Sequence, residues 1–257
     1  MRNDGLVRIL FLALWGATVP AATVAGQGRQ ASPAPAGLLF GYLPHTGEEA
    51  RFHEGYRRHL LWHKEKRDSL NWYGWQVLMG ERPGVFVDGT FGRPFLAFDR
   101  RVDPAGDAAD FAATAGPFAA PQFRTALVLL PELGTGIPLE TGLPTPFLEV
   151  VSYRVRPGTE PAFENLVRSL KSSVDSGAPP ITWYRVVSGS DLTTYLMLIH
   201  RRALAEWDAP LYDLSSQAAR LPEGRRKDAL SVLSNAVVRA GSETWRYLPV
   251  ASLVPNR

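Results

Sequence analysis

Two stretches of the chain repeat each other: YLPHTGEEARF at residues 42–52 and YRVRPGTEPAF at residues 153–163. Both carry a tyrosine in an apolar segment, then a turn with glycine, then a phenylalanine early in the helix expected to follow. The same separation of 111 residues places Trp72-Tyr73 on Trp183-Tyr184 without a gap. Self-similarity of this kind indicates an internal duplication, which has to be recognised before a fold is assigned.

The first copy is the longer one in its middle part. FDRR at 98–101 resembles IHRR at 199–202, which lies only 101 residues further on. We therefore expect about ten additional residues in the first copy's hairpin, where the turn signals Pro83-Gly84 and Asp88-Gly89 lie.

Each copy shows the order strand, helix, two strands, helix, strand. In the first copy we expect strands at 38–43, 72–79, 85–98 and 124–130, a helix after the capping box of Thr46 and Glu49, and a helix at 107–115. In the second copy we expect strands at 147–155, 181–187, 194–200 and 244–254. We also expect a helix with Pro161 in its first turn and Gly177 after its end, and helical segments at 204–219 and at 225–240. Two units of this order are ferredoxin-like.

The strand end of the type Tyr-x-Val/Leu-x-Pro-Gly, the glutamate-containing helix start and its phenylalanine resemble the dimeric α/β-barrel superfamily in a fused, single-chain form. That superfamily includes antibiotic-biosynthesis-monooxygenase-like and NIPSNAP-like domains, stress-responsive barrels, haem-degrading monooxygenases and chlorite-dismutase-like proteins. The resemblance implies an α+β protein in which two tandem ferredoxin-like (βαββαβ) units with facing antiparallel sheets form one α/β barrel. We expect the units at 38–133 and 147–257, with a Gly- and Pro-rich linker at 134–146. Because members of such folds differ in activity, the fold alone does not specify a reaction.

The amino terminus has the pattern of a secretory signal peptide. Arg2 and Arg8 precede the apolar run 9–15, and small residues follow at 21–26. The run is too short for a membrane span, which needs about 20 apolar residues. We expect a signal peptide at 1–26, cleavage near Ala25 or Gly26, a flexible leader at 27–37, and a secreted or periplasmic protein with no membrane span after cleavage.

Composition excludes several classes of protein. The chain has 257 residues and no cysteine, which excludes disulfides, thiolate metal sites and thiol nucleophiles. Its net charge is +3 from 28 basic and 25 acidic residues, and the basic residues form only pairs and one triplet, so no nucleic-acid partner is expected. Motifs for nucleotide cofactors are also missing from the sequence.

Two histidines mark the first helix. At 100° per residue His59 and His63 share the apolar stripe of Phe52 and Tyr56. Their counterparts in the second copy are Leu170 and Val174, ordinary core residues. A buried imidazole is costly unless it is hydrogen-bonded or liganded, so the pair is either catalytic, bound to a metal with an Asp or Glu from elsewhere, or satisfied within the core.

Aromatic residues mark the strands. In Trp72-Tyr73 and in Trp183-Tyr184 the two neighbours point to opposite faces, so one faces the barrel interior and the other the helices. These residues are either core or the walls of a pocket for an apolar or planar ligand. The candidate ligand-binding residues are Tyr56, Trp72, Tyr73, Trp75, Gln76, Trp183, Tyr184, Arg185 and His200.

Two functions remain open at this point. One is a cofactor-independent enzyme, similar to monooxygenases or isomerases, that acts on a small apolar or aromatic substrate with His59 or His63 as general base. The other is a non-catalytic exported protein that binds a small ligand, haem with His63 as the axial residue, or a histidine-bound metal. No cofactor is favoured over the others, and the oligomeric state is left open.

Overall fold

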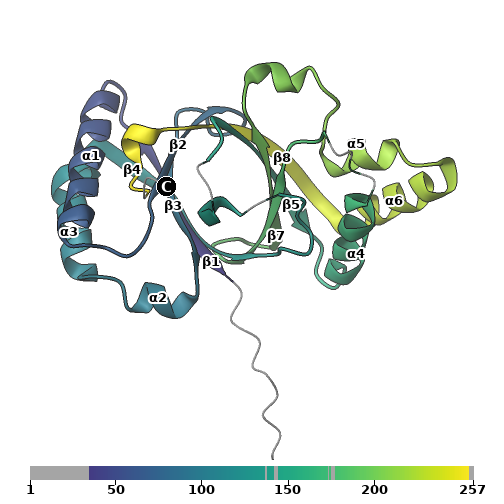
Figure 1. The fold of residues 1–257 in the computed structure, drawn as a ribbon, viewed down its shortest axis with the longest axis horizontal. Helices are drawn as coiled ribbons and strands as arrows, with labels where there is room; N and C mark the ends of the chain where they lie inside the picture. The colour runs from purple at the N-terminus through teal and green to yellow at the C-terminus, as the bar shows by residue number, and fades with distance from the viewer. Residues whose placement is uncertain (1–34, 137, 142–143, 173, 175–176, 255–257) are drawn as a thin grey trace, which may run out of the picture. The chain divides into compact units, whose positions relative to one another are not determined.

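The structure is a computed structural model that describes residues 35–136, 138–141, 144–172, 174 and 177–254. The expected signal peptide and residues 27–34 of the expected leader lie outside the described residues. The described part forms a closed antiparallel barrel with the strand order β1-β3-β2-β8-β5-β7-β6-β4. Figure 1 looks along this barrel and shows helices on two opposite sides of it.

Both halves of the barrel have one topology. The first half consists of β1 (Ala36–Pro44), β2 (Tyr73–Met79), β3 (Phe86–Arg93) and β4 (Ala119–Leu129), and the second of β5 (Phe147–Val155), β6 (Ile181–Ser188), β7 (Thr193–Arg201) and β8 (Val237–Tyr247). In each half the fourth strand pairs with the first, the first with the third, and the third with the second. The barrel closes where β2 pairs with β8 and β4 with β6. Two tandem ferredoxin-like units in one α/β barrel are therefore confirmed.

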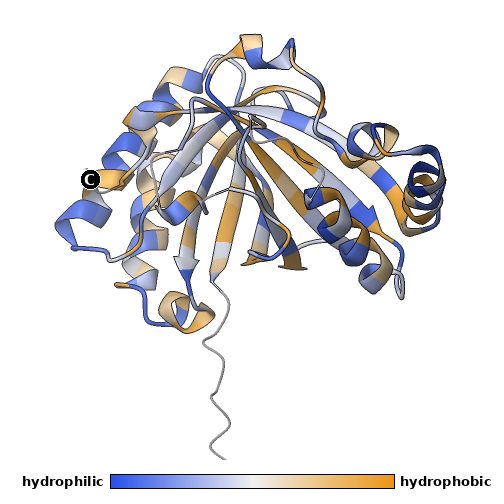
Figure 2. Ribbon diagram, turned by 45° about the vertical axis from the view of Figure 1, so that its right-hand side comes forward, coloured by the Kyte–Doolittle hydropathy of each residue, from blue (hydrophilic) through white to orange (hydrophobic). Residues whose placement is uncertain are grey.

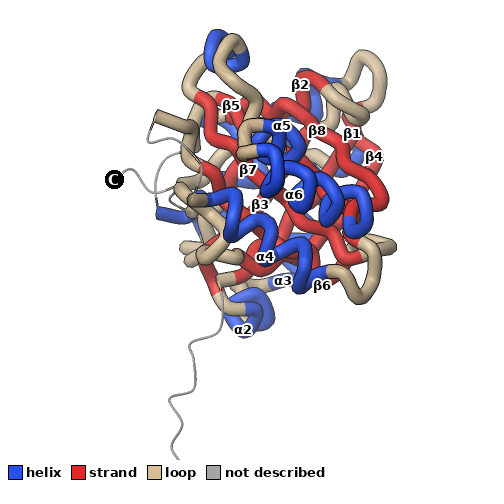
Figure 3. The backbone as a smooth tube through the Cα atoms, turned by 90° about the vertical axis from the view of Figure 1, so that its right-hand side faces the viewer, coloured by secondary structure: helices blue, strands red, loops and turns tan. Residues whose placement is uncertain are grey.

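The helices form separate layers over the two halves. The first layer contains α1 (Glu49–Glu65) and α3 (Pro104–Thr114), and the second contains α4 (Glu160–Lys171), α5 (Leu214–Ala219) and α6 (Glu223–Ala236). Figure 3 shows the second layer lying across the strands of its sheet. No helix in the described part of the chain is both long and apolar enough to cross a membrane.

Side chains fill the barrel and both spaces under the helices. Tyr73, Trp75 and Tyr184 belong to the cluster inside the barrel, whereas Trp72 packs under the first helix layer and Trp183 under the second. The expected division of each Trp-Tyr pair between two faces is thus observed. Figure 2 shows apolar strand segments in the barrel and more hydrophilic colouring along the helices.

Strand register identifies a further difference between the two halves. Phe40 on β1 pairs with Asp88 on β3, and its counterpart Val151 on β5 pairs with Met197 on β7. Asp88 therefore occupies the position of Met197, a fully buried residue under the second helix layer. The first half places a carboxyl group where the second half has an ordinary core side chain.

Several expected boundaries are wrong. Residues 95–99 form the short helix α2 (Phe95–Asp99) after Pro94, so FDRR at 98–101 is no counterpart of IHRR, which lies in and just after a strand. Asp88-Gly89 lies inside β3 and is not a turn. Thr46 does not cap α1, whose N-cap is Glu48 without a side-chain hydrogen bond.

The second half also departs from expectation at three places. Helix α4 ends at Lys171, before Gly177. The segment 204–219 is divided into a 3-10 turn (Leu204–Trp207) and α5, with Pro210 between them. The last strand ends at Tyr247, because 249–251 form another 3-10 turn.

Candidate functional site

Helix α1 holds His59 and His63 against helix α3. The two histidines are four residues apart on the buried face of α1 and are 5% and 3% exposed. Gly55, one turn earlier, lets the helices approach closely, because a Cβ there would lie 2.2 Å from the Thr114 carbonyl oxygen. The histidines therefore lie between the helix layer and the outer face of the first sheet, outside the barrel interior.

Helix α3 supplies the acidic partners. It begins at Pro104 after the N-cap Asp103, whose side chain accepts a hydrogen bond from the Gly106 amide. Asp107 and Asp110 are three residues apart and so project from the same face, toward α1. Side chains from two helices thus meet at one point.

Three ligand-type atoms converge there. His59 Nε2 lies 3.2 Å from His63 Nε2 and 3.2 Å from Asp107 Oδ1, and His63 Nε2 lies 3.5 Å from Asp107 Oδ1. Two ligand atoms at 2.0–2.1 Å from a tetrahedral ion are about 3.3 Å apart. The triangle therefore has the size that a bound ion requires, with a centre about 1.9 Å from each of the three atoms.

The opposite ring nitrogens are held by carboxylates. His59 Nδ1 lies 2.8 Å from Asp110 Oδ2, and His63 Nδ1 lies 2.9 Å from Asp68 Oδ2. Asp68 also accepts hydrogen bonds from the Trp72 indole and the Leu70 amide. Burial alone would raise the pKa of Asp68, but these hydrogen bonds outweigh it and lower the pKa. Carboxylates that orient the far nitrogen of a histidine are typical of metal sites.

The proton positions follow from these partners. A carboxylate oxygen can only accept, so each Nδ1 carries the hydrogen and each neutral ring presents a lone pair at Nε2. Two such lone pairs and a carboxylate oxygen then face one another, an arrangement that requires a cation or a proton among them. Burial acts to lower the pKa of His59, but its hydrogen bonds to Asp107 and Asp110 prevail and raise it.

A second buried carboxyl group lies close by. Tyr56 donates a hydrogen bond of 2.9 Å to Asp88 Oδ2, and both side chains are buried. Burial raises the pKa of Asp88 to about 7, although the Tyr56 hydrogen bond acts to lower it. Within the described part of the chain, Asp88 Oδ1 has no hydrogen-bond partner.

A cavity of about 280 Å³ adjoins this cluster. His59, Asp107 and Asp88 contribute to its lining, so two of the three converging residues border open space. The other lining residues are aromatic, basic or small: Phe40, Tyr42, Trp72, Arg101, Ala108, Phe111, Ala112 and Arg124.

Only some of the site residues predicted from the sequence lie at this cavity. Trp72 lines it, Tyr56 reaches it through Asp88, and His63 lies behind His59 with its ring 4.8 Å from that of Trp72. The remaining predicted residues lie in three other places. The inside of the barrel contains Tyr73, Trp75 and Tyr184. Gln76 lies beside His53 on the helix side of β2. The second half of the chain contributes Trp183, Arg185 and His200.

Arg185 and His200 have partners of their own. Arg185 is exposed and lies 3.9 Å from Glu164. His200 is buried, with its Nε2 3.2 Å from the Thr182 hydroxyl oxygen, and burial lowers its pKa to about 4.

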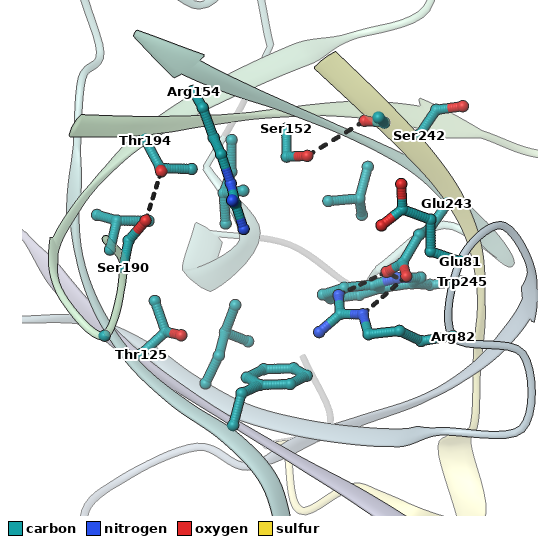
Figure 4. Close-up of a pocket in the computed structure, with 17 residues that line it drawn as sticks. Glu81, Arg82, Thr125, Ser152, Arg154, Ser190, Thr194, Ser242, Glu243 and Trp245 are labelled. Atoms are coloured by element: carbon teal, nitrogen blue, oxygen red, sulfur yellow. Dashed lines mark hydrogen bonds and ion pairs between the residues drawn. The ribbon is translucent and has the colours of Figure 1, made fainter. Parts of the chain in front are cut away.

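A further pocket of about 300 Å³ lies at one end of the barrel (Figure 4). Its polar groups largely satisfy one another. Arg82 forms two hydrogen bonds of 2.8 and 2.7 Å with Glu243, and Ser190 bonds to Thr194 at 2.6 Å. Among the described residues, three ligand-type atoms converge at His59, His63 and Asp107 and not in this pocket, so the cluster around His59 is the stronger candidate site.

Sequence reasoning missed the four aspartates of the site: Asp68, Asp88, Asp107 and Asp110. A signal for two of them existed, because Asp107 and Asp110 are acidic residues one turn apart in a segment otherwise rich in Ala and Gly. The Asp88-Gly89 pair predicts a turn, and only the strand register brings Asp88 to the site.

Comparison with known proteins identifies structures with the same fold. No protein-family model and no curated protein sequence matches the chain. Solved structures match at low identity. A candidate monooxygenase from Fusobacterium nucleatum subsp. nucleatum ATCC 25586 is 10% identical, with a TM-score of 0.58 over 87% of this chain and 96% of that one.

Two further structures agree with it. An anthrone oxidase-like protein is 10% identical over 84% of this chain and 92% of its own, with a TM-score of 0.51. A mutant chlorite dismutase from Candidatus Nitrospira defluvii is 11% identical over 86% and 94%, with a TM-score of 0.52. These similarities confirm the dimeric α/β-barrel fold and leave the reaction to be argued from the site.

Proposed function

We propose that this protein binds a divalent transition-metal ion through His59 Nε2, His63 Nε2 and Asp107 Oδ1, and that the ion acts on a small molecule held in the adjoining cavity. The observation that carries the proposal is the convergence of three ligand-type atoms within 3.5 Å of one another, while each Nδ1 atom lies within 2.9 Å of a carboxylate oxygen. A histidine in a protein core needs one hydrogen-bond partner, whereas His59 and His63 each have polar partners at both ring nitrogens.

The donor set favours a particular class of ion. Two imidazoles and one carboxylate suit Zn²⁺ or Fe²⁺, whereas Mg²⁺ and Ca²⁺ prefer oxygen ligands alone. Three protein ligands leave at least one coordination position for water or substrate, which is typical of catalytic sites and not of structural ones. His59 and Asp107 both line the cavity, so an open position would face it.

The chemistry of such a site would be activation of an oxygen atom. An ion bound there polarises a carbonyl or lowers the pKa of a bound water. Asp110 and Asp68 keep the two imidazoles oriented, and Asp88, which accepts a hydrogen bond from Tyr56, lines the cavity. The proposed substrate is a small apolar or aromatic molecule.

A second candidate is a metal-free enzyme that resembles monooxygenases or isomerases, with His59 as the general base. The His59–Asp110 pair supports it, because a carboxylate at Nδ1 makes Nε2 more basic. The candidate monooxygenase among the structural matches has the same fold, but at 10% identity it lends no residue to this role.

Metal binding separates the two candidates. The purified chain, stripped with a chelator, would be titrated with Zn²⁺ and with Co²⁺ and its metal content measured by mass spectrometry. We expect one ion per chain and, with Co²⁺, visible absorption of a low-symmetry site. His59→Leu/His63→Val should lose both signals. His53→Gln is the matched control, because His53 lies on the same helix outside the cluster. Binding that is absent, or equal in the double variant, would favour the metal-free enzyme.

We also propose that the chain is exported. The proposal rests on the charged, apolar and small-residue order of residues 1–26 and on the absence of cysteine from the sequence.

A further inference from the structure

Two polar atoms at the cavity have no partner in the described part of the chain. They are Asp88 Oδ1, in a side chain that is only 5% exposed, and Arg101 Nε. Both residues line the cavity. A buried polar atom without a hydrogen bond costs about 1–3 kcal/mol, so a ligand that bonded to both atoms would remove two such costs.

Four aromatic side chains line the same cavity. Phe40, Tyr42, Trp72 and Phe111 line the cavity, and Tyr42 packs on Phe111 at 4.9 Å between ring centroids. A dry cavity of about 150 Å³ accommodates benzene. The volume here, about 280 Å³, is enough for one ring with two substituents.

Positive charge lies at the same cavity. Arg101 is joined by Arg124, whose guanidinium lies 6.0 Å from the Phe40 ring. Within the described part of the chain, neither arginine forms an ion pair with a carboxylate. An anionic group on the ligand would supply one. A guanidinium binds a carboxylate with particular strength because its N–H groups match the two oxygens.

We infer that the cavity takes a small planar aromatic acid, whose carboxylate is bound by Arg101 and whose hydroxyl group bonds to Asp88. The inference rests on the proposed function, because the metal ion would lie at the same cavity wall as His59 and Asp107. It narrows the substrate class from apolar or aromatic molecules to hydroxylated aromatic acids.

Four probes test this ligand class: 3- and 4-hydroxybenzoate, benzoate, and 4-hydroxybenzamide, the neutral analogue of the second acid. None of them places a hydroxyl beside the carboxylate, so they do not chelate the ion as salicylate does. Binding would be measured by calorimetry on metal-loaded protein, with the metal content of every sample determined. The variants are Arg101→Met, Arg101→Lys and Asp88→Met, and Arg100→Met is the exposed neighbouring control.

The expected result is a preference of about 10- to 100-fold for 4-hydroxybenzoate over its amide, the factor of one charged hydrogen bond. Arg101→Met should abolish this preference, Arg101→Lys should restore part of it, and Arg100→Met should leave it intact. In the natural protein, one of the two hydroxybenzoates should bind more tightly than benzoate. Asp88→Met should abolish this difference in affinity.

Equal binding of acid and amide, or a preference that survives Arg101→Met, would overturn the inference. The metal measurement keeps the two proposals apart. Metal uptake without discrimination between the probes rejects the ligand class alone. Discrimination without metal uptake rejects the metal centre and leaves the assignment of Arg101 standing.

Discussion

Replacing Asp88 by asparagine in the metal-free protein should change how stability depends on pH. The side chain is fully buried, and burial raises its pKa from 3.8 to about 7. In the unfolded chain the carboxyl group ionises near 3.8, whereas in the folded protein it stays protonated until about pH 7. The unfolded state is therefore favoured progressively as the pH rises from 4 to 7, and the loss is complete above pH 7.

The size of the effect follows from the pKa difference. One pKa unit corresponds to 1.36 kcal/mol, so the folded protein should lose about 4 kcal/mol between pH 4 and pH 8 through this group. Asparagine keeps the shape and cannot ionise. The unfolding free energy of Asp88→Asn minus that of the natural protein should therefore increase by about this amount over the range. Urea unfolding followed by circular dichroism at five pH values measures the difference.

Asp88→Met provides a second measure of the same effect, since methionine is the residue at the equivalent position of the second half. Both variants should give the same slope with pH, whatever constant offset their packing introduces. A flat difference, or one that decreases with rising pH, would refute the reasoning that Asp88 is a buried acid held by Tyr56.

Three further predictions concern other parts of the chain. Zn²⁺ at 100 times its Kd should stabilise the natural protein by about 2.7 kcal/mol and raise its Tm by about 5–10 °C, and should leave His59→Leu/His63→Val unchanged; an equal shift in both proteins would contradict this. Burial lowers the pKa of His200 to about 4, whereas the unfolded chain takes up this proton near pH 6.5. The free energy of unfolding should therefore fall by about 3 kcal/mol as the pH is lowered from above 6.5 to 4. His200→Gln should remove that loss in acid unfolding curves, and unchanged curves would show the group to be unperturbed. Amino-terminal sequencing of the exported fraction should begin near Gln27, and an intact Met1 in the cytosol would reject export.

The duplication could be predicted from the sequence because strand ends and helix starts carry short-range signals. The Tyr-Gly-Phe spacing and the Trp-Tyr pair survive in both halves, and the strand order agrees with them. The alignment failed at 98–101, where a similar string of letters occurs in a short helix in one half and in a strand in the other. String similarity does not carry the hydrogen-bond register that decides such a case.

From the sequence, only the part of the candidate site that lies on helix α1 could be predicted. His59 and His63 were found because they interrupt an apolar stripe that the second half keeps intact. Their carboxylate partners come from helix α3 and, for His63, from Asp68 in the loop after α1. The period of one helix cannot tell which helix packs against it, so Asp107 and Asp110 became visible only with the α1–α3 contact. Asp88 was hidden for a different reason, since Asp-Gly in a sequence is more often a turn than part of a strand.

The aromatic residues show the limit of residue type as evidence. Tyr73 and Trp75 have the composition expected of a ligand pocket, yet they pack inside the barrel with Phe91 and Trp245. Trp72, one residue before Tyr73, points to the other face and lines the cavity. The alternation along a strand separated these candidates, and the sequence could not say which of the two faces holds the site.

The most direct test of the metal centre is anomalous X-ray diffraction from crystals of the Zn²⁺-loaded protein, collected on both sides of the zinc edge. We expect one strong peak at about 2.0–2.1 Å from His59 Nε2, His63 Nε2 and Asp107. We also expect the ion to face the cavity lined by Trp72. A peak elsewhere, for example at Glu81 and Glu243 in the barrel-end pocket, or no peak at all in protein shown to be folded, would contradict it.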